Sequence, residues 1–193
     1  DKRIVFLCEW VEGADFPAIV VDNANGARLA VQHLHALGHR RIAYVEGPPC
    51  NVLTLSRKRG LEEECSKFGL EPPVIFPGDF SIESGQAAAR SLLCTDPRPS
   101  AVFCSSDTAA IGVITGLREG GLSVPQDVSV IGFDDIEMAA FYDPALTTIR
   151  QERRLLGRRA AELLVARLGG HETKGEVVPV TLVERGTTGP APA

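Results

Sequence analysis

A mostly parallel β-sheet covered by helices on both faces is the fold class that this 193-residue sequence predicts. Short apolar runs alternate strictly with longer segments of helical period, which requires right-handed crossovers between parallel strands. The apolar runs are continuous rather than alternating, as in strands that are buried on both faces. Glycine, the usual helix stop, follows three of the helical segments, at Gly38, Gly69 and Gly120. These observations indicate a doubly wound α/β fold.

The individual elements follow in chain order from these patterns. Strands are expected at seven apolar runs, residues 4–8, 18–21, 41–45, 74–76, 101–104, 128–133 and 177–183. Helices are expected at five amphipathic stretches, residues 27–37, 57–68, 82–93, 107–119 and 152–168. Residues 187–193, rich in Pro, Gly and Ala, are expected to form a mobile tail.

Length and composition limit the class of protein. The chain suits one large domain or two lobes that share a hinge. No apolar run approaches the roughly 20 residues of a membrane span, and the run at 4–8 is too short for the core of a signal peptide. The formal net charge is −5, and the densest basic stretches, at 57–59 and 153–159, lie among acidic neighbours. We therefore expect neither a membrane partner nor strong DNA binding by this chain alone.

Cysteine usage and missing motifs argue against metal, cofactor and catalytic chemistry. The five cysteines are an odd number without a CxxC pair, which favours a reducing cytoplasm over a disulfide framework. The four histidines do not cluster with them, so no metal site is expected. A nucleotide-dependent enzyme is the weakest alternative, because the sequence has no GxGxxG after the first strand, no GxxxxGK[ST] loop and no nucleophile–base pair. We expect no cofactor and no enzymatic activity.

Polar and aromatic side chains follow several of the predicted strands. In open α/β sheets, ligands bind beyond the carboxyl ends of the strands, so these residues are the candidate site. Arg57 follows the loop after strand 41–45, and Phe80 follows strand 74–76. Ser106 and Asp107 follow strand 101–104, and Asp134 comes directly after the apolar run 128–133. Asp134 is the best single candidate.

This set of groups suits a small polar ligand. A carboxylate accepts from two neighbouring hydroxyls, a guanidinium donates in a fixed fork, and an aromatic ring supports the C–H face of a sugar. Structural roles remain open: Asp107 as a helix N-cap, Asp135 as the tie of a turn, Arg57 as a surface charge and Phe80 as a core residue. None of these groups requires catalysis.

Several motifs in register resemble the lactose/galactose repressor (LacI/GalR) family of transcriptional regulators. They include LGHRRIA at 37–43, RKRG at 57–60 and GDF at 78–80. The strongest are VPQDVSVIGFDD at 124–135 and PALTTIRQ at 144–151. The sensing domain of that family is similar to periplasmic sugar-binding proteins.

The resemblance implies a type I periplasmic-binding-protein-like sensing domain with two lobes. Residues 22–150 and 179–193 would form the C-terminal lobe, a doubly wound parallel sheet. Residues 1–21 and 151–178 would form part of the N-terminal lobe. The DNA-binding headpiece, the linker helix and the first βα units are expected to lie outside this chain.

The family's functional residues carry over position by position. Arg57, Phe80 as a stacking ring, Ser106 beside Asp107, and Asp134 match effector-binding positions. Asn51 occupies a loop position at which purine-responsive members carry an arginine that grips the effector, and this departure argues against a purine. The resemblance places a dimer interface near Ile111, Phe141 and Tyr142, although ordinary loop packing is an alternative for the two aromatic residues.

The expected function is that of a cytoplasmic effector-sensing domain. A small polar effector, a sugar or related metabolite, would bind in an inter-lobe cleft and favour lobe closure. The homodimer would pass this change to operator DNA only through the headpiece. The alternative is a periplasmic or extracellular sugar-binding protein of a transporter, against which stand the unpaired cysteines and the 144–151 motif. The identity of the effector stays open.

Overall fold

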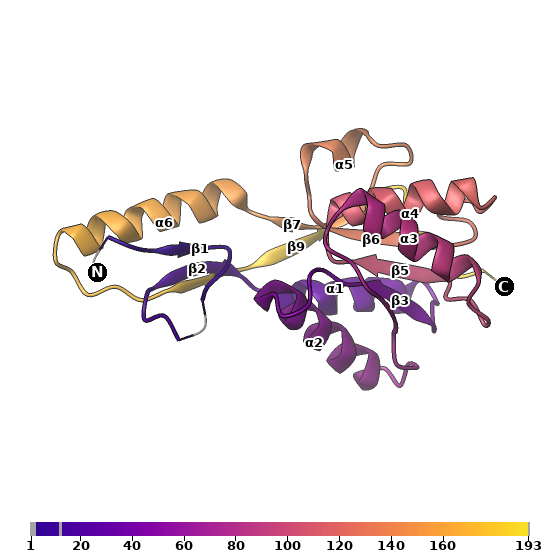
Figure 1. Ribbon diagram of the computed structural model, residues 1–193, viewed down its shortest axis with the longest axis horizontal. Helices are drawn as coiled ribbons and strands as arrows, with labels where there is room; N and C mark the ends of the chain where they lie inside the picture. Colours follow the sequence, from indigo (N-terminus) through magenta and orange to yellow (C-terminus); the bar gives the residue numbers. More distant parts are fainter. Residues whose placement is uncertain (1–2, 12, 193) are drawn as a thin grey trace. The chain divides into compact units, whose positions relative to one another are not determined.

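The computed structural model describes residues 3–11 and 13–192, and the chain folds into two compact units (Figure 1). The first unit comprises the described residues of Asp1–Asp22 together with Gln151–Val180. The second unit comprises Asn23–Arg150 and the described residues of Thr181–Ala193. The chain therefore passes between the units three times.

The second unit contains a six-stranded sheet with the strand order β4-β3-β5-β6-β7-β9. Pairing is parallel between β3 and β4, β3 and β5, β5 and β6, and β6 and β7. The strand bounds are β3 Ile42–Val45, β4 Val74–Phe76, β5 Ala101–Cys104, β6 Ser129–Asp134, β7 Thr147–Gln151 and β9 Val180–Val183. The prediction of a doubly wound parallel sheet is confirmed.

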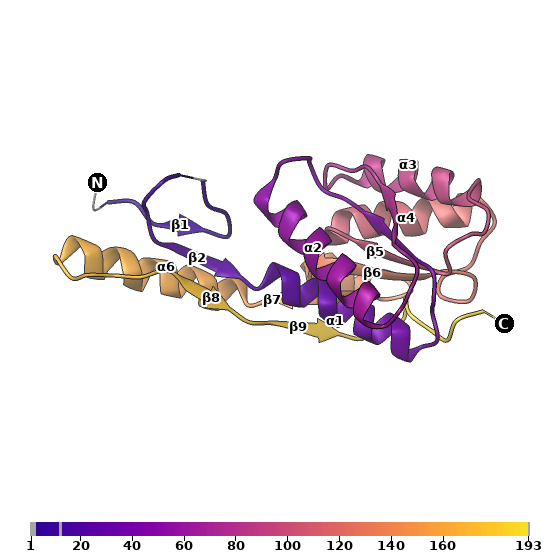
Figure 2. The ribbon, with the colours of Figure 1, turned by 90° about the horizontal axis from the view of Figure 1, so that it is seen from below.

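Two pairs of helices cover the two faces of this sheet (Figures 1 and 2). The helices are α1 (Asn23–Ala36) with α2 (Val52–Lys67) on one face, and α3 (Ile82–Leu93) with α4 (Asp107–Glu119) on the other. A short helix, α5 (Glu137–Phe141), follows β6. Glycines let α3 and α4 approach closely, because a Cβ on Gly112 would lie 2.1 Å from the carbonyl oxygen of Ile82. The buried core lies between these helix pairs and the sheet.

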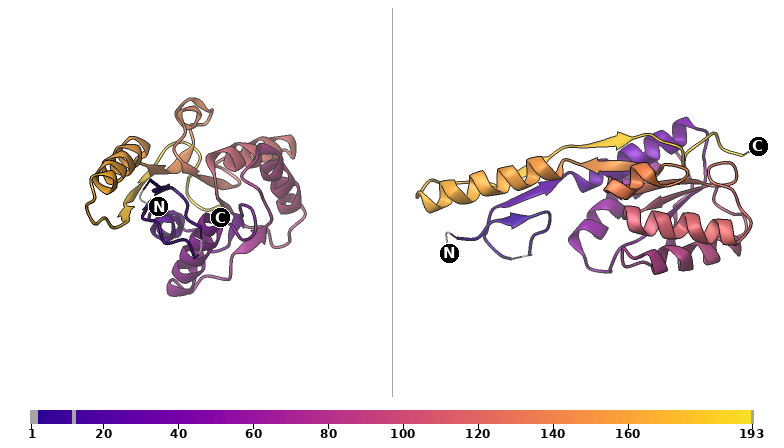
Figure 3. Two further views of the ribbon diagram at one scale, coloured as in Figure 1. Left: turned by 60° about the vertical axis from the view of Figure 1, so that its left-hand side comes forward. Right: turned by 90° about the horizontal axis from the view of Figure 1, so that it is seen from above.

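The first unit is a smaller α/β layer. Its strands β1 (Phe6–Leu7), β2 (Ala18–Val21) and β8 (Glu176–Val178) form a three-stranded parallel sheet in the order β1-β2-β8. Helix α6 (Arg153–Leu168) runs alongside this sheet (Figure 3). Within α6 only Leu156 is buried, while Val165 and Leu168 are exposed. Across the described residues, none of the helices is both long and apolar enough to cross a membrane.

Some expected elements differ from the observed ones. The single strand expected at 177–183 is two strands, β8 and β9, in different sheets. The break falls at Pro179, which has no N–H to donate to a ladder. The strand expected at 4–8 shortens to Phe6–Leu7, and Cys8 beyond it has a left-handed backbone with φ 67°. Helices α1 and α2 begin earlier than expected, and β7 and α5 were not predicted.

Candidate functional site

Arg57 is held in a buried position by three other parts of the second unit. Its Nε donates to Asn23 Oδ1 at 2.9 Å, and one Nη donates to the carbonyl oxygen of Ser105. The guanidinium lies over the ring of Phe133, with its carbon 3.6 Å from the ring centroid. Only 2% of Arg57 is exposed, so its interpretation as a surface helix charge is wrong. These contacts fix both the plane and the position of the guanidinium.

The start of α2 explains how Arg57 reaches this position. Asn51 is the N-cap of α2, and its Oδ1 accepts from the N–H of Leu53 at 2.8 Å and of Thr54 at 3.3 Å. The cap starts the helix at Val52, so Arg57 stands in its second turn rather than at its first residue. Asn51 therefore has a structural role here, and its contact with an effector stays a prediction.

Phe80 and Ser106 are joined by a hydrogen bond. Ser106 Oγ donates to the carbonyl oxygen of Phe80 at 3.0 Å and, as the N-cap of α4, accepts from the N–H of Ala109 at 3.0 Å. Phe80 has φ 71°, a left-handed conformation that is rare outside glycine. Its half-buried ring lies against Gly47, where a Cβ would come within 2.2 Å of the ring. The ring thus packs on the backbone at Gly47, and the residue as a whole is half-buried.

Asp107 is fully buried and bonded to protein groups. Its carboxylate accepts from the N–H of Ile136 at 2.8 Å and from the hydroxyl of Thr148. Burial raises the pKa of this carboxyl to about 6, against the opposing effect of these two hydrogen bonds. The expectation of an N-cap at Asp107 is wrong, because Ser106 caps α4. Asp107 instead ties α4 to the turn after β6 and to β7.

Asp134 ends β6 and is followed at once by a tight turn. Asp134 has φ 123° and Asp135 has φ 52°, so two successive residues lie in the left-handed region. The Asp135 carboxylate bonds to Arg150 Nε at 2.6 Å and to an Nη of Arg185 at 2.7 Å. Burial alone raises the pKa of Asp135, but the two arginines outweigh it and hold the pKa below its usual range. Asp135 ties the turn, as its position suggested.

The residues that the sequence singled out share the carboxyl edge of the six-stranded sheet. Arg57 stacks on Phe133, the residue before Asp134, and bonds to Ser105, the residue before Ser106. Ser106 in turn bonds to Phe80. These contacts connect the Arg57 guanidinium to the ends of β5 and β6 and the Ser106 hydroxyl to Phe80, and Asp134 is the last residue of β6.

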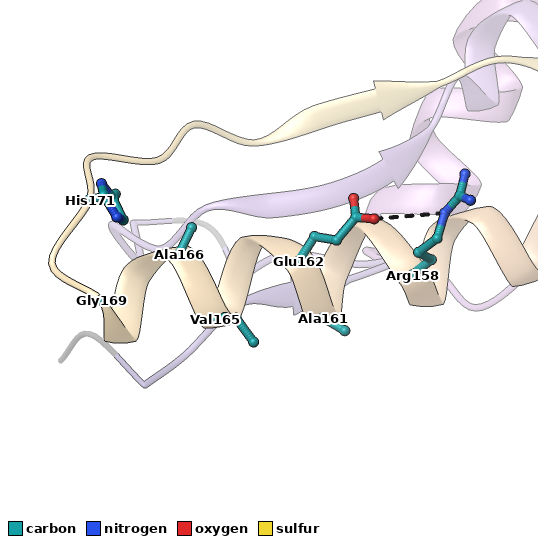
Figure 4. A pocket seen from close by; sticks show the side chains of 7 residues that line it. All are labelled: Arg158, Ala161, Glu162, Val165, Ala166, Gly169 and His171. Carbon is teal, nitrogen blue, oxygen red and sulfur yellow. Dashed lines mark ion pairs between the residues drawn. The ribbon is translucent and has the colours of Figure 1, made fainter.

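Three hollows lie elsewhere. One of about 710 Å³ runs along α6, where Arg158 and Glu162 form an ion pair (Figure 4). A second, of about 760 Å³, lies between the segment 15–17 and residues 167–175. A third, of about 420 Å³, lies at the carboxyl end of α2. In the described part of the chain, no three His, Cys, Asp or Glu side chains gather to hold a metal ion.

Comparison with known proteins decides the family. Residues 31–188 match the family of periplasmic binding protein-like domains. The chain is 37% identical over 189 residues to the HTH-type transcriptional repressor CytR of Escherichia coli strain K12. It is 32% identical to a LacI family transcriptional regulator from Enterococcus faecium solved with bound ribose, with a TM-score of 0.87 over 94% of this chain and 68% of that chain. The chain belongs to the LacI family.

A solved dimeric Lac repressor with a C-terminal deletion is also similar to this LacI-family chain. The identity is 34% and the TM-score 0.89, over 97% of this chain and 69% of that chain. The match to CytR covers 96% of this chain and 55% of CytR, so the chain spans about half the length of that relative. These relatives are transcriptional regulators, so the alternative of a transporter's binding protein is set aside.

The residues expected at a LacI-family dimer interface lie on α4 and around α5. Phe141 is 78% exposed and Met138 56% exposed, which excludes ordinary loop packing for Phe141. Tyr142 is half-buried, with its hydroxyl 3.2 Å from Thr115 Oγ1, and Ile111 is half-buried on α4. Tyr142 therefore packs within its own unit, whereas Phe141 presents an apolar ring at the surface.

Several residues of this LacI-family site were missed in the sequence. Asn23 is the second residue after β2, so the rule that selected the other strand-end residues also applies to it. Phe133 and the Ser105 carbonyl contact Arg57 through tertiary packing, and no local pattern marks them. Arg150 and Arg185 meet Asp135 for the same reason.

Proposed function

We propose that this chain is the greater part of the effector-sensing domain of a LacI-family transcriptional regulator, and that its effector is a small polar compound of the sugar class. The observation that supports this most is the set of contacts that connects Arg57 to the ends of β5 and β6 and Ser106 to Phe80, with Asp134 as the last residue of β6. One similar structure contains ribose, and another is a complex of the regulator CelR with cellobiose. We propose no enzymatic role.

Each of the four residues would have a different role in recognising the effector. The Asp134 carboxylate would accept hydrogen bonds from two neighbouring hydroxyls. The fixed guanidinium of Arg57 would donate to ring or hydroxyl oxygens, and the Phe80 ring would support a C–H face. Ser106 would act mainly by holding Phe80, since its hydroxyl already bonds to the Phe80 backbone.

We also propose how the units relate to a complete regulator. The second unit would correspond to the C-terminal lobe, which was expected at 22–150 and 179–193. The first unit would correspond to part of the N-terminal lobe, which was expected at 1–21 and 151–178. The protein would act as a cytoplasmic homodimer, with Phe141 and Ile111 at the interface. Operator DNA would be bound through a helix-turn-helix headpiece rather than by this acidic chain.

A calorimetric titration of the full-length protein tests the site. The titrants are D-ribose and cellobiose, with cytidine and adenine as members of another class. We expect Asp134→Asn and Phe80→Leu to weaken sugar binding by about tenfold or more, because each loses one well-oriented contact. The control is Asp127→Asn. It also removes a carboxylate, one that accepts from the N–H of Ser123, but Asp127 lies before the start of β6, whereas Asp134 lies at its end. Unchanged sugar affinity in both site variants would refute the assignment. Binding of cytidine or adenine, without binding of either sugar, would refute the sugar class.

A further inference from the structure

The turn after β6 holds two consecutive non-glycine residues in an unfavourable backbone conformation. Asp134 has φ 123° and Asp135 has φ 52°. L-residues rarely occupy this region, and such conformations persist only where surrounding contacts impose them. The direction of the Asp134 carboxylate therefore depends on whatever holds the turn.

Asp135 holds the turn with its side chain. Its Oδ2 accepts from Arg150 Nε at 2.6 Å and its Oδ1 accepts from an Nη of Arg185 at 2.7 Å. The side chains of Asp135 and Arg185 are only 10% and 16% exposed, so water screens this pair weakly.

Arg185 is itself anchored to the rest of the second unit. Its other Nη donates to the carbonyl oxygen of Leu146 at 2.7 Å, and its N–H donates to Thr147 Oγ1 at 2.9 Å. Arg185, which holds Asp135, is thereby hydrogen-bonded to Thr147 of β7 and to Leu146, the residue before β7. Arg150, the second arginine, is the sheet partner of Asp134 in the register of β6 and β7.

The next residue of the turn is held as well. The N–H of Ile136 donates to Asp107 at 2.8 Å, and Asp107 also accepts from Thr148 of β7. Of the two positions that follow Asp134, Asp135 is thus bonded to Arg150 and Arg185, and Ile136 is bonded to the buried Asp107. In addition, Arg150 and Arg185 offset the negative charge that Asp135 places beside Asp134.

We propose that Asp135 is a positioning residue that sets the direction of the Asp134 carboxylate and thereby determines affinity for the effector. This inference rests on the proposed function, in which Asp134 contacts the effector. Asp135 itself is engaged by two arginines, so it acts through Asp134. A site whose carboxylate is oriented in advance loses less conformational freedom when a hydroxylated compound binds.

A double-mutant cycle in the full-length protein tests the inference, with D-ribose and cellobiose as the probes. We expect Asp135→Asn to weaken sugar affinity by about tenfold in the native background and by less than twofold when Asp134→Asn is already present. Because Asp134 and Asp135 are neighbours whose effects on stability can couple, the melting temperature of all four proteins is measured, and affinities are compared at a temperature at which each is folded. Asp127→Asn serves as the control for a lost carboxylate that lies before β6.

The outcomes separate the two proposals. If Asp134→Asn leaves affinity unchanged, the proposed site is wrong. If Asp134→Asn weakens binding but Asp135→Asn does not, or if the two effects simply add, the positioning role is wrong. If neither sugar binds, hydrogen exchange on the ligand-free protein decides the positioning role.

In that measurement, Asp135→Asn should speed exchange of the Ile136 N–H by about tenfold or more, while Val130 and Ile131 within β6 stay protected. Unchanged exchange at Ile136 would show that the turn does not depend on Asp135, which would overturn the inference.

Discussion

Asp107 offers a sharp test of the physical reasoning, because it is a buried carboxyl whose ionisation opposes folding. Burial raises its pKa to about 6, while the hydrogen bonds from Thr148 and Ile136 favour the ionised form and only reduce that shift. The nearby carboxylates of Asp134 and Asp135 add smaller contributions in the same direction as burial. In an unfolded chain the pKa of an aspartate is about 3.9. The folded protein therefore binds the Asp107 proton more tightly than the unfolded chain does.

The magnitude follows from the difference between the two pKa values. A gap of about 2 pKa units corresponds to about 3 kcal/mol of folding free energy. Because the folded pKa of Asp107 is raised, this stabilisation is fully present below about pH 4 and is lost as the pH rises through about 6. Asp107→Asn cannot titrate and keeps the shape and one acceptor oxygen of the carboxyl.

Urea unfolding between pH 4 and pH 8 measures the effect. The free energy of unfolding of Asp107→Asn relative to the native protein should increase by about 3 kcal/mol across this range. Thr148→Val is the companion variant: without its hydroxyl the pKa of Asp107 rises further, so the loss of stability moves to higher pH. Parallel pH profiles for the native protein and Asp107→Asn would refute the reasoning.

Four further outcomes are expected. Gly112→Ala should lower the free energy of unfolding by about 3 kcal/mol in urea titrations because its Cβ meets a backbone carbonyl, whereas Gly157→Ala, with open space around it in α6, should raise it by roughly 0.5–1 kcal/mol. Burial lowers the pKa of His39, so the native protein should lose stability as the pH falls through about 6.5 and below, and thermal unfolding of His39→Gln should show a flatter pH profile. Tyr44→Phe should raise the free energy of unfolding by about 1 kcal/mol, since the buried hydroxyl has no hydrogen-bond partner in the part of the chain that the structure describes; calorimetric melting checks this, and a loss would contradict it. Phe141→Glu should shift the full-length protein from dimer to monomer in sedimentation velocity, because a charged side chain would replace the exposed ring. A dimer that persists in this variant would place the interface elsewhere.

Much of the fold was predictable because its signals are local. The apolar runs at Ala18–Val21, Val74–Phe76 and Ala101–Cys104 became strands with the expected bounds. Helices Ile82–Leu93 and Asp107–Glu119 also have the expected bounds, because the amphipathic period and the residues that end a helix can be recognised from consecutive residues. The earlier start of α2 had a readable signal too, namely Asn51 as an N-cap.

Strand β7 escaped prediction for a physical reason. It contains Thr147, Thr148, Arg150 and Gln151, so it is not an apolar run. The two threonines are nevertheless fully buried, because the Thr148 hydroxyl bonds to Asp107 and the Thr147 hydroxyl accepts from the N–H of Arg185. Burial of a polar side chain depends on a partner that is distant in sequence, and periodicity carries no information about that partner.

The sequence by itself determined the parallel sheet and the edge at which Arg57, Phe80, Ser106 and Asp134 gather, because strand direction and chain order decide which residues end at the same edge. Only the tertiary structure decided what each neighbouring group does. Asp135 meets Arg150 and Arg185 across 15 and 50 positions of the chain, and Arg57 meets Ser105 across 48. Such pairings follow from how helices and strands pack in three dimensions, where distance along the chain no longer limits contact.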